Sequence, residues 1–111
     1  MSKISVLGTD YEILIQNEKE NPKLKNANGL CEIFAQKVII ENPKERNDEC
    51  AYENVNAYWH KVLRHEFFHA IFAEAGLTDY LEDETLVDVL AVLYPKIKKI
   101  MEQADDFDFT P

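Results

Sequence analysis

The sequence contains few cysteines and no long apolar run. These two features limit the classes of protein to which the chain can belong. Cys31 and Cys50 are its two cysteines, and neither belongs to a C-x-x-C pair or to a cluster of other metal ligands. We therefore expect two free thiols in a reducing compartment. No apolar run approaches the ~18 residues of a transmembrane helix, and no charged segment followed by an apolar one opens the chain. We expect no membrane partner and a cytoplasmic location.

The sequence also has fewer basic than acidic residues. The chain has 12 basic and 21 acidic residues and a formal net charge of −9. Such an excess of negative charge argues against a nucleic-acid backbone as a partner. The length of 111 residues suits one domain with a single modest core. We assign residues 1–103 to that domain and residues 104–111 to a frayed acidic tail.

Two pairs of short apolar segments predict a small, mostly antiparallel sheet of three or four strands. Residues 3–16 alternate between apolar and polar on either side of a turn near Gly8, which indicates a hairpin. Residues 30–34 and 38–40 are also apolar, and β-branched side chains in the second segment favour a strand. The polar residues 17–28 carry Asn-Pro and Asn-Gly turn signals, so they form a connection with a short helical turn.

Two helices are predicted after the sheet. The first begins between Asp48 and Asn54, either of which can cap it, and ends at Gly76. The second begins near Asp79, which with Glu82 resembles a capping pair. Pro95 should kink this helix or make it restart, because proline lacks a backbone donor. The result is an α+β fold, in which a small antiparallel sheet packs against a buried first helix and a second, C-terminal helix.

The first helix contains the pattern H-E-x-x-H, formed by His65, Glu66 and His69. Side chains four residues apart share one helix face, so both imidazoles can reach one zinc ion. Catalytic zinc sites keep an open position for water, whose pKa the ion lowers to about 7. Glu66 stands where it can take the proton of that water and pass it to a leaving amine. The alternative is two core-facing histidines beside a solvated glutamate.

The third metal ligand is expected among the acidic residues after Gly76. Glu84 differs from Glu82 and Asp83 because it has an acid, Asp88, four residues later. This spacing lets one carboxylate bind the metal while the other accepts the far ring N–H of a ligating histidine. The alternative is that these acids only favour the N-terminus of a helix.

H-E-x-x-H followed by Glu84-x-x-x-Asp88 resembles the gluzincins, the thermolysin-like zinc metallopeptidases. The run from Glu84 to Asp88 also looks like the small zincin-like proteins of phages and prophages, distant relatives of the ImmA-type peptidases. This resemblance implies Zn²⁺ as cofactor, with His65, His69 and Glu84 as ligands and Glu66 as the catalytic base. It implies that Asp88 orients a ligating histidine. It further implies an endopeptidase that acts on a specific protein or peptide in the cytoplasm of a host cell.

The sequence departs from related patterns at several points. A metzincin would continue with glycine and histidine, where this chain has Phe72 and Ala75. No motif identifies the residue that stabilises the oxyanion, and Tyr80 and Tyr94 are both candidates. Residues 37–41 are expected to be the edge strand that holds an extended substrate.

A second function stays open, namely a catalytically silent zincin-fold module that binds a partner protein such as a repressor. A third possibility is a helix pair that binds no metal. Two imidazoles and a carboxylate also suit non-haem iron, although the glutamate of H-E-x-x-H favours zinc.

Overall fold

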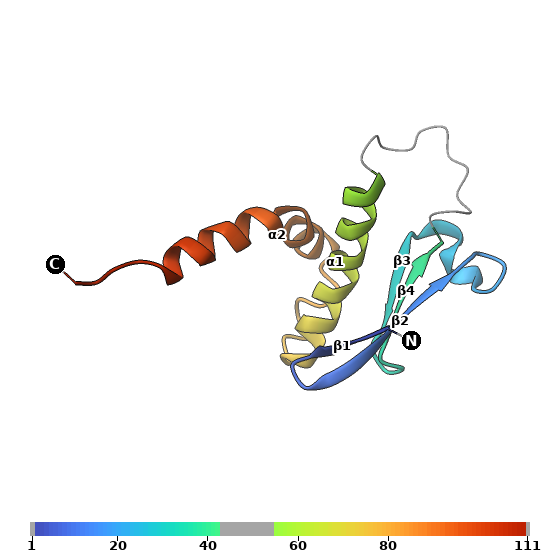
Figure 1. Ribbon diagram of the computed structural model, residues 1–111. Helices are drawn as coiled ribbons and strands as arrows, with labels where there is room; N and C mark the ends of the chain where they lie inside the picture. The colour runs from blue at the N-terminus through green and yellow to red at the C-terminus, as the bar shows by residue number, and fades with distance from the viewer. Residues whose placement is uncertain (1, 43–54, 111) are drawn as a thin grey trace.

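The computed structural model describes residues 2–42 and 55–110, which form a four-stranded sheet, a short 3₁₀ helix and two α-helices (Figure 1). The predicted α+β class is confirmed. The elements in chain order are β1 Ser2–Val6, β2 Thr9–Gln16, η1 Pro22–Asn26, β3 Gly29–Glu32, β4 Lys37–Glu41, α1 Val55–Glu74 and α2 Glu84–Asp105. Cys50 and the cap expected between Asp48 and Asn54 lie outside the described residues.

The sheet has the strand order β1-β2-β4-β3 and is mixed. Both predicted hairpins are present, since β1 pairs with β2 and β3 pairs with β4 in the antiparallel sense. The first hairpin turns through Leu7 and Gly8, whose positive φ angles of 50° and 95° match the right-handed twist of the strands. The two hairpins join through a parallel pairing of β2 with β4, which the crossover through η1 makes possible.

The position of β4 contradicts one expectation. Residues 37–41 were expected to be the edge strand, but β4 lies between β2 and β3 and is paired on both sides. Its three central residues are all buried, as expected of an interior strand. The edge beside α1 belongs to β3 instead.

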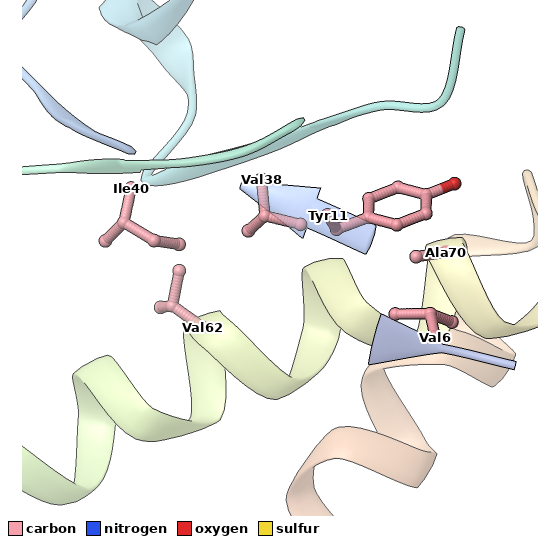
Figure 2. Close-up of a cluster of buried hydrophobic side chains, with 6 residues drawn as sticks. All are labelled: Val6, Tyr11, Val38, Ile40, Val62 and Ala70. Atoms are coloured by element: carbon pink, nitrogen blue, oxygen red, sulfur yellow. The ribbon is translucent and has the colours of Figure 1, made fainter. Parts of the chain in front are cut away.

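The core lies between one face of the sheet and α1. Figure 2 shows Val38 and Ile40 pointing from the sheet toward Val62 on α1. Tyr11 and Val38 are fully buried, and each such side chain contributes roughly 1.5–3 kcal/mol by leaving water. Alternate residues of the strands therefore pack against residues three or four apart on α1. This packing fixes α1 over β3 and β4.

The C-terminal end of α1 is fixed by its cap and by a carboxylate. Gly76 has φ 77°, and the N–H groups of Gly76 and Leu77 donate to the carbonyls of Ala73 and Phe72, which is a Schellman motif. Glu74 accepts hydrogen bonds of 3.0 Å from Thr9 Oγ1 and from the Tyr11 hydroxyl. The last turn of α1 is thereby tied to β2.

The start of α2 differs from the prediction. The helix begins at Glu84, and Asp83 is its N-cap, accepting a 3.0 Å hydrogen bond from the N–H of Leu86. Residues 78–82 form turns, so the capping pair expected at Asp79 is wrong. The turns after the Schellman motif first return the chain to α1. The helix α2 therefore starts only at Glu84, with Asp83 as its cap.

Pro95 lies inside α2, which continues through it to Asp105 rather than restarting. A proline cannot donate to the carbonyl four residues earlier, here that of Ala91. Arg64 on α1 supplies the missing donor, since its Nε lies 2.8 Å from the Ala91 oxygen. The helix is thus continuous because its neighbour satisfies the carbonyl that proline leaves free.

The C-terminal part of α2 extends away from the sheet (Figure 1). The radius of gyration is 16.1 Å, larger than the roughly 13 Å of a compact chain of 100 residues. Among the described residues, neither α-helix is apolar enough over a sufficient length to cross a membrane.

Candidate metal centre

Three side chains converge where the start of α2 approaches the middle of α1. His65 and His69 lie four residues apart on α1, with ring centroids 5.1 Å apart. Glu84, the first residue of α2, reaches both rings: one carboxylate oxygen lies 2.8 Å from His65 Nε2 and the other 3.1 Å from His69 Nε2. The ligand atoms of the three residues all lie within 4.8 Å of one another.

The other ring nitrogen of each histidine is held by an oxygen that carries no hydrogen. His65 Nδ1 lies 3.1 Å from Asp88 Oδ1, and His69 Nδ1 contacts the backbone carbonyl of Leu81. A carboxylate and a carbonyl can only accept, so both Nδ1 atoms must donate. In a neutral imidazole with Nδ1–H, Nε2 carries a free lone pair. In the neutral form, both histidines therefore present to Glu84 the nitrogen that can ligate a metal.

The chemistry of this donor set fits a divalent cation. Two Nε2 lone pairs facing the oxygens of one carboxylate repel each other unless positive charge lies between them. Two imidazole nitrogens and one carboxylate oxygen form the ligand set of many catalytic zinc sites. The hydrogen bonds to both Nδ1 atoms fix the orientation of the rings, as is usual for zinc-ligating histidines. His65, His69 and Glu84 would hold the ion.

Glu66 stands apart from this ligand group. Its side chain is 7% exposed and lies against β3, where Gly29 leaves space for it. Burial raises the pKa of the Glu66 carboxyl and the nearby charge of Glu84 adds to this, while His65 and His69 oppose it. A carboxylate with a raised pKa is a stronger base, so it is better suited to accept a proton and later return it.

Asp88 is held as a carboxylate by two partners. Burial alone would raise its pKa, but hydrogen bonds from Lys61 and His65 outweigh that effect and lower the pKa of Asp88. Lys61 Nζ lies 3.2 Å from the same oxygen that His65 approaches. The charged form of Asp88 is the better acceptor for the Nδ1–H of His65.

Three features of this site were missed by the sequence reasoning. Lys61 lies four residues before His65, so helical spacing is the signal that places it beside Asp88. The sequence signal for Gly29 is weaker, because it is only that of an Asn-Gly pair, which is typical of turns. The carbonyl of Leu81 has no signal at all, because a backbone acceptor does not depend on residue type.

Each of the two tyrosines considered for the oxyanion contacts a side chain of α1. Tyr80 lies 6.4 Å from Phe72 between ring centroids, and the Tyr94 ring lies 5.9 Å from the guanidinium carbon of Arg64. The third histidine, His60, is exposed and contacts the Asn56 carbonyl of its own helix. His60 does not belong to the group of candidate ligands found among the described residues.

Comparisons with protein-family models, with curated proteins and with solved structures gave no match.

Proposed function

We propose that this chain is a zinc-dependent metallopeptidase that hydrolyses a peptide bond in a specific protein substrate. The observation that supports the proposal most is the pair of His65 and His69 Nε2 atoms, which face one Glu84 carboxylate while both Nδ1 atoms are already committed as donors. A divalent cation bound by both Nε2 atoms and the carboxylate would satisfy all three groups at once. The buried Glu66 beside them has no role in a purely structural zinc site.

Each residue has a distinct part in the proposed reaction. Bound zinc would lower the pKa of water and polarise the carbonyl of the scissile bond. Glu66 takes a proton from the attacking water and then donates it to the leaving amine. Asp88 and the Leu81 carbonyl keep both imidazoles in the ligating tautomer.

The edge of β3 that pairs with no described strand is the proposed binding surface for the substrate. β3 is the last strand in the described sheet, and Gly29 at its start adjoins Glu66. An extended peptide can add to such an edge through main-chain hydrogen bonds. Bound peptide should slow amide exchange in β3 and leave β4 unchanged. Equal exchange with and without peptide would remove β3 as the binding surface.

The free thiol of Cys31 supports a reducing location, and we propose the cytoplasm of a host cell. Bacteriophage or prophage origin, suggested by the sequence resemblance, is part of the same proposal.

The direct test compares zinc-loaded wild type with Glu66→Gln. Both proteins are incubated with a peptide library and with whole-cell protein, and new amino termini are identified by mass spectrometry. We expect cleavage by wild type and a loss of at least about 10²-fold in Glu66→Gln, at equal zinc content. Equal activity in both proteins would exclude Glu66 as the base. No cleavage by the zinc-loaded wild type would favour the binding module, which needs the fold but not Glu66.

A further inference from the structure

Asp88, the acceptor that orients His65, is not held in place by packing. Its side chain is 46% exposed, and it stands on the second turn of α2, where a carboxylate can turn toward water. Among the described residues, the hydrogen-bond partners of this side chain are His65 and Lys61. The orientation of the Asp88 carboxylate therefore depends on these two residues.

Lys61 is the better anchored of the two groups in its ion pair with Asp88. It precedes His65 by four residues on α1, so both side chains leave the same helix face. Lys61 Nζ lies 3.2 Å from Asp88 Oδ1, the same oxygen that lies 3.1 Å from His65 Nδ1. The Lys61 side chain is only 29% exposed, and its ammonium lies over the Tyr58 ring, 5.5 Å from the centroid. This distance is within the range of a cation–π contact.

Tyr58 is in turn tied to the sheet. Its hydroxyl accepts a hydrogen bond from the side chain of Asn28, which directly precedes β3. A continuous set of contacts therefore runs from the start of β3 through Tyr58, Lys61 and Asp88 to His65. Lys61 is the member of this set that crosses from α1 to α2.

We propose that Lys61 is a positioning residue of the candidate metal centre, which holds the Asp88 carboxylate where it accepts the Nδ1–H of His65. The inference rests on the metal binding of the proposed function and not on peptide cleavage. Without the ammonium, Asp88 turns toward water more often. His65 then carries its proton on Nε2 for part of the time and donates it to Glu84, which lies 2.8 Å away. A protonated Nε2 has no lone pair for a metal.

The alternative is an ordinary ion pair that only joins two helices. An ion pair with this much exposure contributes little to stability. The contact between α1 and α2 also has other supports, since Arg64 bonds the carbonyl of Ala91 and Val87 is fully buried. If the pair only joins the helices, its loss leaves the affinity for zinc unchanged.

The charge of Lys61 makes the sign of the effect informative. A positive charge near the centre repels a divalent cation, so its removal alone should strengthen zinc binding. The loss of positioning should weaken zinc binding, because His65 ligates less well. Weaker binding after removal of the ammonium therefore cannot be an effect of charge.

A double-mutant cycle in the full chain tests the proposal, with zinc affinity measured by chelator competition. Its members are wild type, Lys61→Met, Asp88→Ala and the double variant. Methionine keeps an unbranched apolar side chain beside Tyr58 and removes the ammonium. Lys96→Met is the matched control, because it removes the same charge from an exposed lysine roughly 18 Å along α2 from Glu84.

We expect Lys61→Met to weaken zinc binding by about 3–10-fold, less than Asp88→Ala, because Lys61 acts through Asp88. In the Asp88→Ala background the same change should not weaken binding further. Lys96→Met should leave the affinity within about twofold of wild type. Equal or tighter binding by Lys61→Met would overturn the proposal, as would the same weakening in both backgrounds.

A second readout needs no metal. Long-range ¹H–¹⁵N spectra of the metal-free protein at about pH 8, where an imidazole is neutral, report which nitrogen of His65 carries the proton. We expect Nδ1–H in wild type and a mixture with Nε2–H in Lys61→Met. Unchanged Nδ1–H in the variant would contradict the positioning role. A tautomer change in a protein that binds no zinc would support that role for Lys61 and refute the proposed function instead.

Discussion

Replacing Gly29 with alanine should destabilise the protein through Glu66, the proposed catalytic base. A Cβ at Gly29 would lie 3.0 Å from Glu66 Cγ, 3.1 Å from Glu66 Oε2 and 3.1 Å from Val62 Cγ1. Ordinary contacts between carbon atoms are ~3.5–4.0 Å, so these neighbours must move by about 0.5 Å. Glu66 and Val62 are buried, and overpacking of this kind costs about 1–3 kcal/mol. We expect the unfolding temperature to fall by roughly 4–8 °C for each kcal/mol.

A double-mutant cycle separates this contact from a general effect on β3. In a Glu66→Ala background two of the three close contacts disappear, so the cost of Gly29→Ala should drop by at least about 1 kcal/mol. Gly76→Ala is the matched control. A Cβ there meets nothing within 4 Å, but φ is 77°, so its cost comes from the backbone and should add independently to that of Glu66→Ala.

The readout is urea unfolding of the four proteins of the cycle, followed by zinc content and peptide cleavage. Gly29→Ala should keep its zinc, because Glu66 is not a ligand, but cleave more slowly, since small displacements of a catalytic group can cost about 10²-fold. The reasoning would be refuted by an equal cost of Gly29→Ala, within about 0.5 kcal/mol, in both backgrounds.

Three further predictions follow from individual contacts. Asp88→Ala should weaken zinc binding by roughly 10–100-fold in a chelator competition, because His65 loses its orienting acceptor; an unchanged affinity would exclude that role. Burial, with the nearby charges of Glu66 and Glu32, raises the pKa of the Cys31 thiol to about 12. In a Cys50→Ser variant, folded Cys31 should therefore react with iodoacetamide far more slowly at pH 9 than the unfolded chain does. The thiol of the unfolded chain ionises at a lower pH than the folded one, so the free energy of unfolding should fall as the pH rises from about 9 toward 12. Equal reactivity of the folded and unfolded chains would contradict the raised pKa of Cys31. Arg64→Met should cost about 1–2 kcal/mol in urea unfolding, and less in a Pro95→Ala background, where the helix again supplies a donor to the Ala91 carbonyl; an equal cost in both would be inconsistent with that hydrogen bond.

The parts of the fold that could be predicted from the sequence depend on neighbours along the chain. Both hairpins follow from local alternation, and the end of α1 follows from Gly76, whose positive φ favours glycine. The spacing of His65 and His69, and that of Glu84 and Asp88, placed each pair on one helix face. The structure brings these two faces together at the candidate metal centre.

The parts that could not be predicted depend on choices between distant segments. Local patterns do not reveal which edges of two hairpins will join, so the parallel pairing of β2 with β4 had no signal, although the unbroken apolar run of β4 is typical of an interior strand. Asp79 and Asp83 both resemble caps, and tertiary packing selects the second. The hydrogen bond to the Leu81 carbonyl depends on the path of the turns after α1.

Zinc content per chain tests the central claim most directly. Wild type, Glu84→Ala and the control Glu82→Ala are purified in parallel, supplied with zinc, freed of excess metal and analysed by elemental mass spectrometry. Glu82 is an exposed acid near Glu84 but is not part of the candidate ligand group. We expect about one zinc per chain in wild type and in Glu82→Ala, and a sharp loss in Glu84→Ala, because two histidines alone hold zinc weakly. A folded wild type without zinc, or equal zinc in all three proteins, would contradict the proposed ligand set.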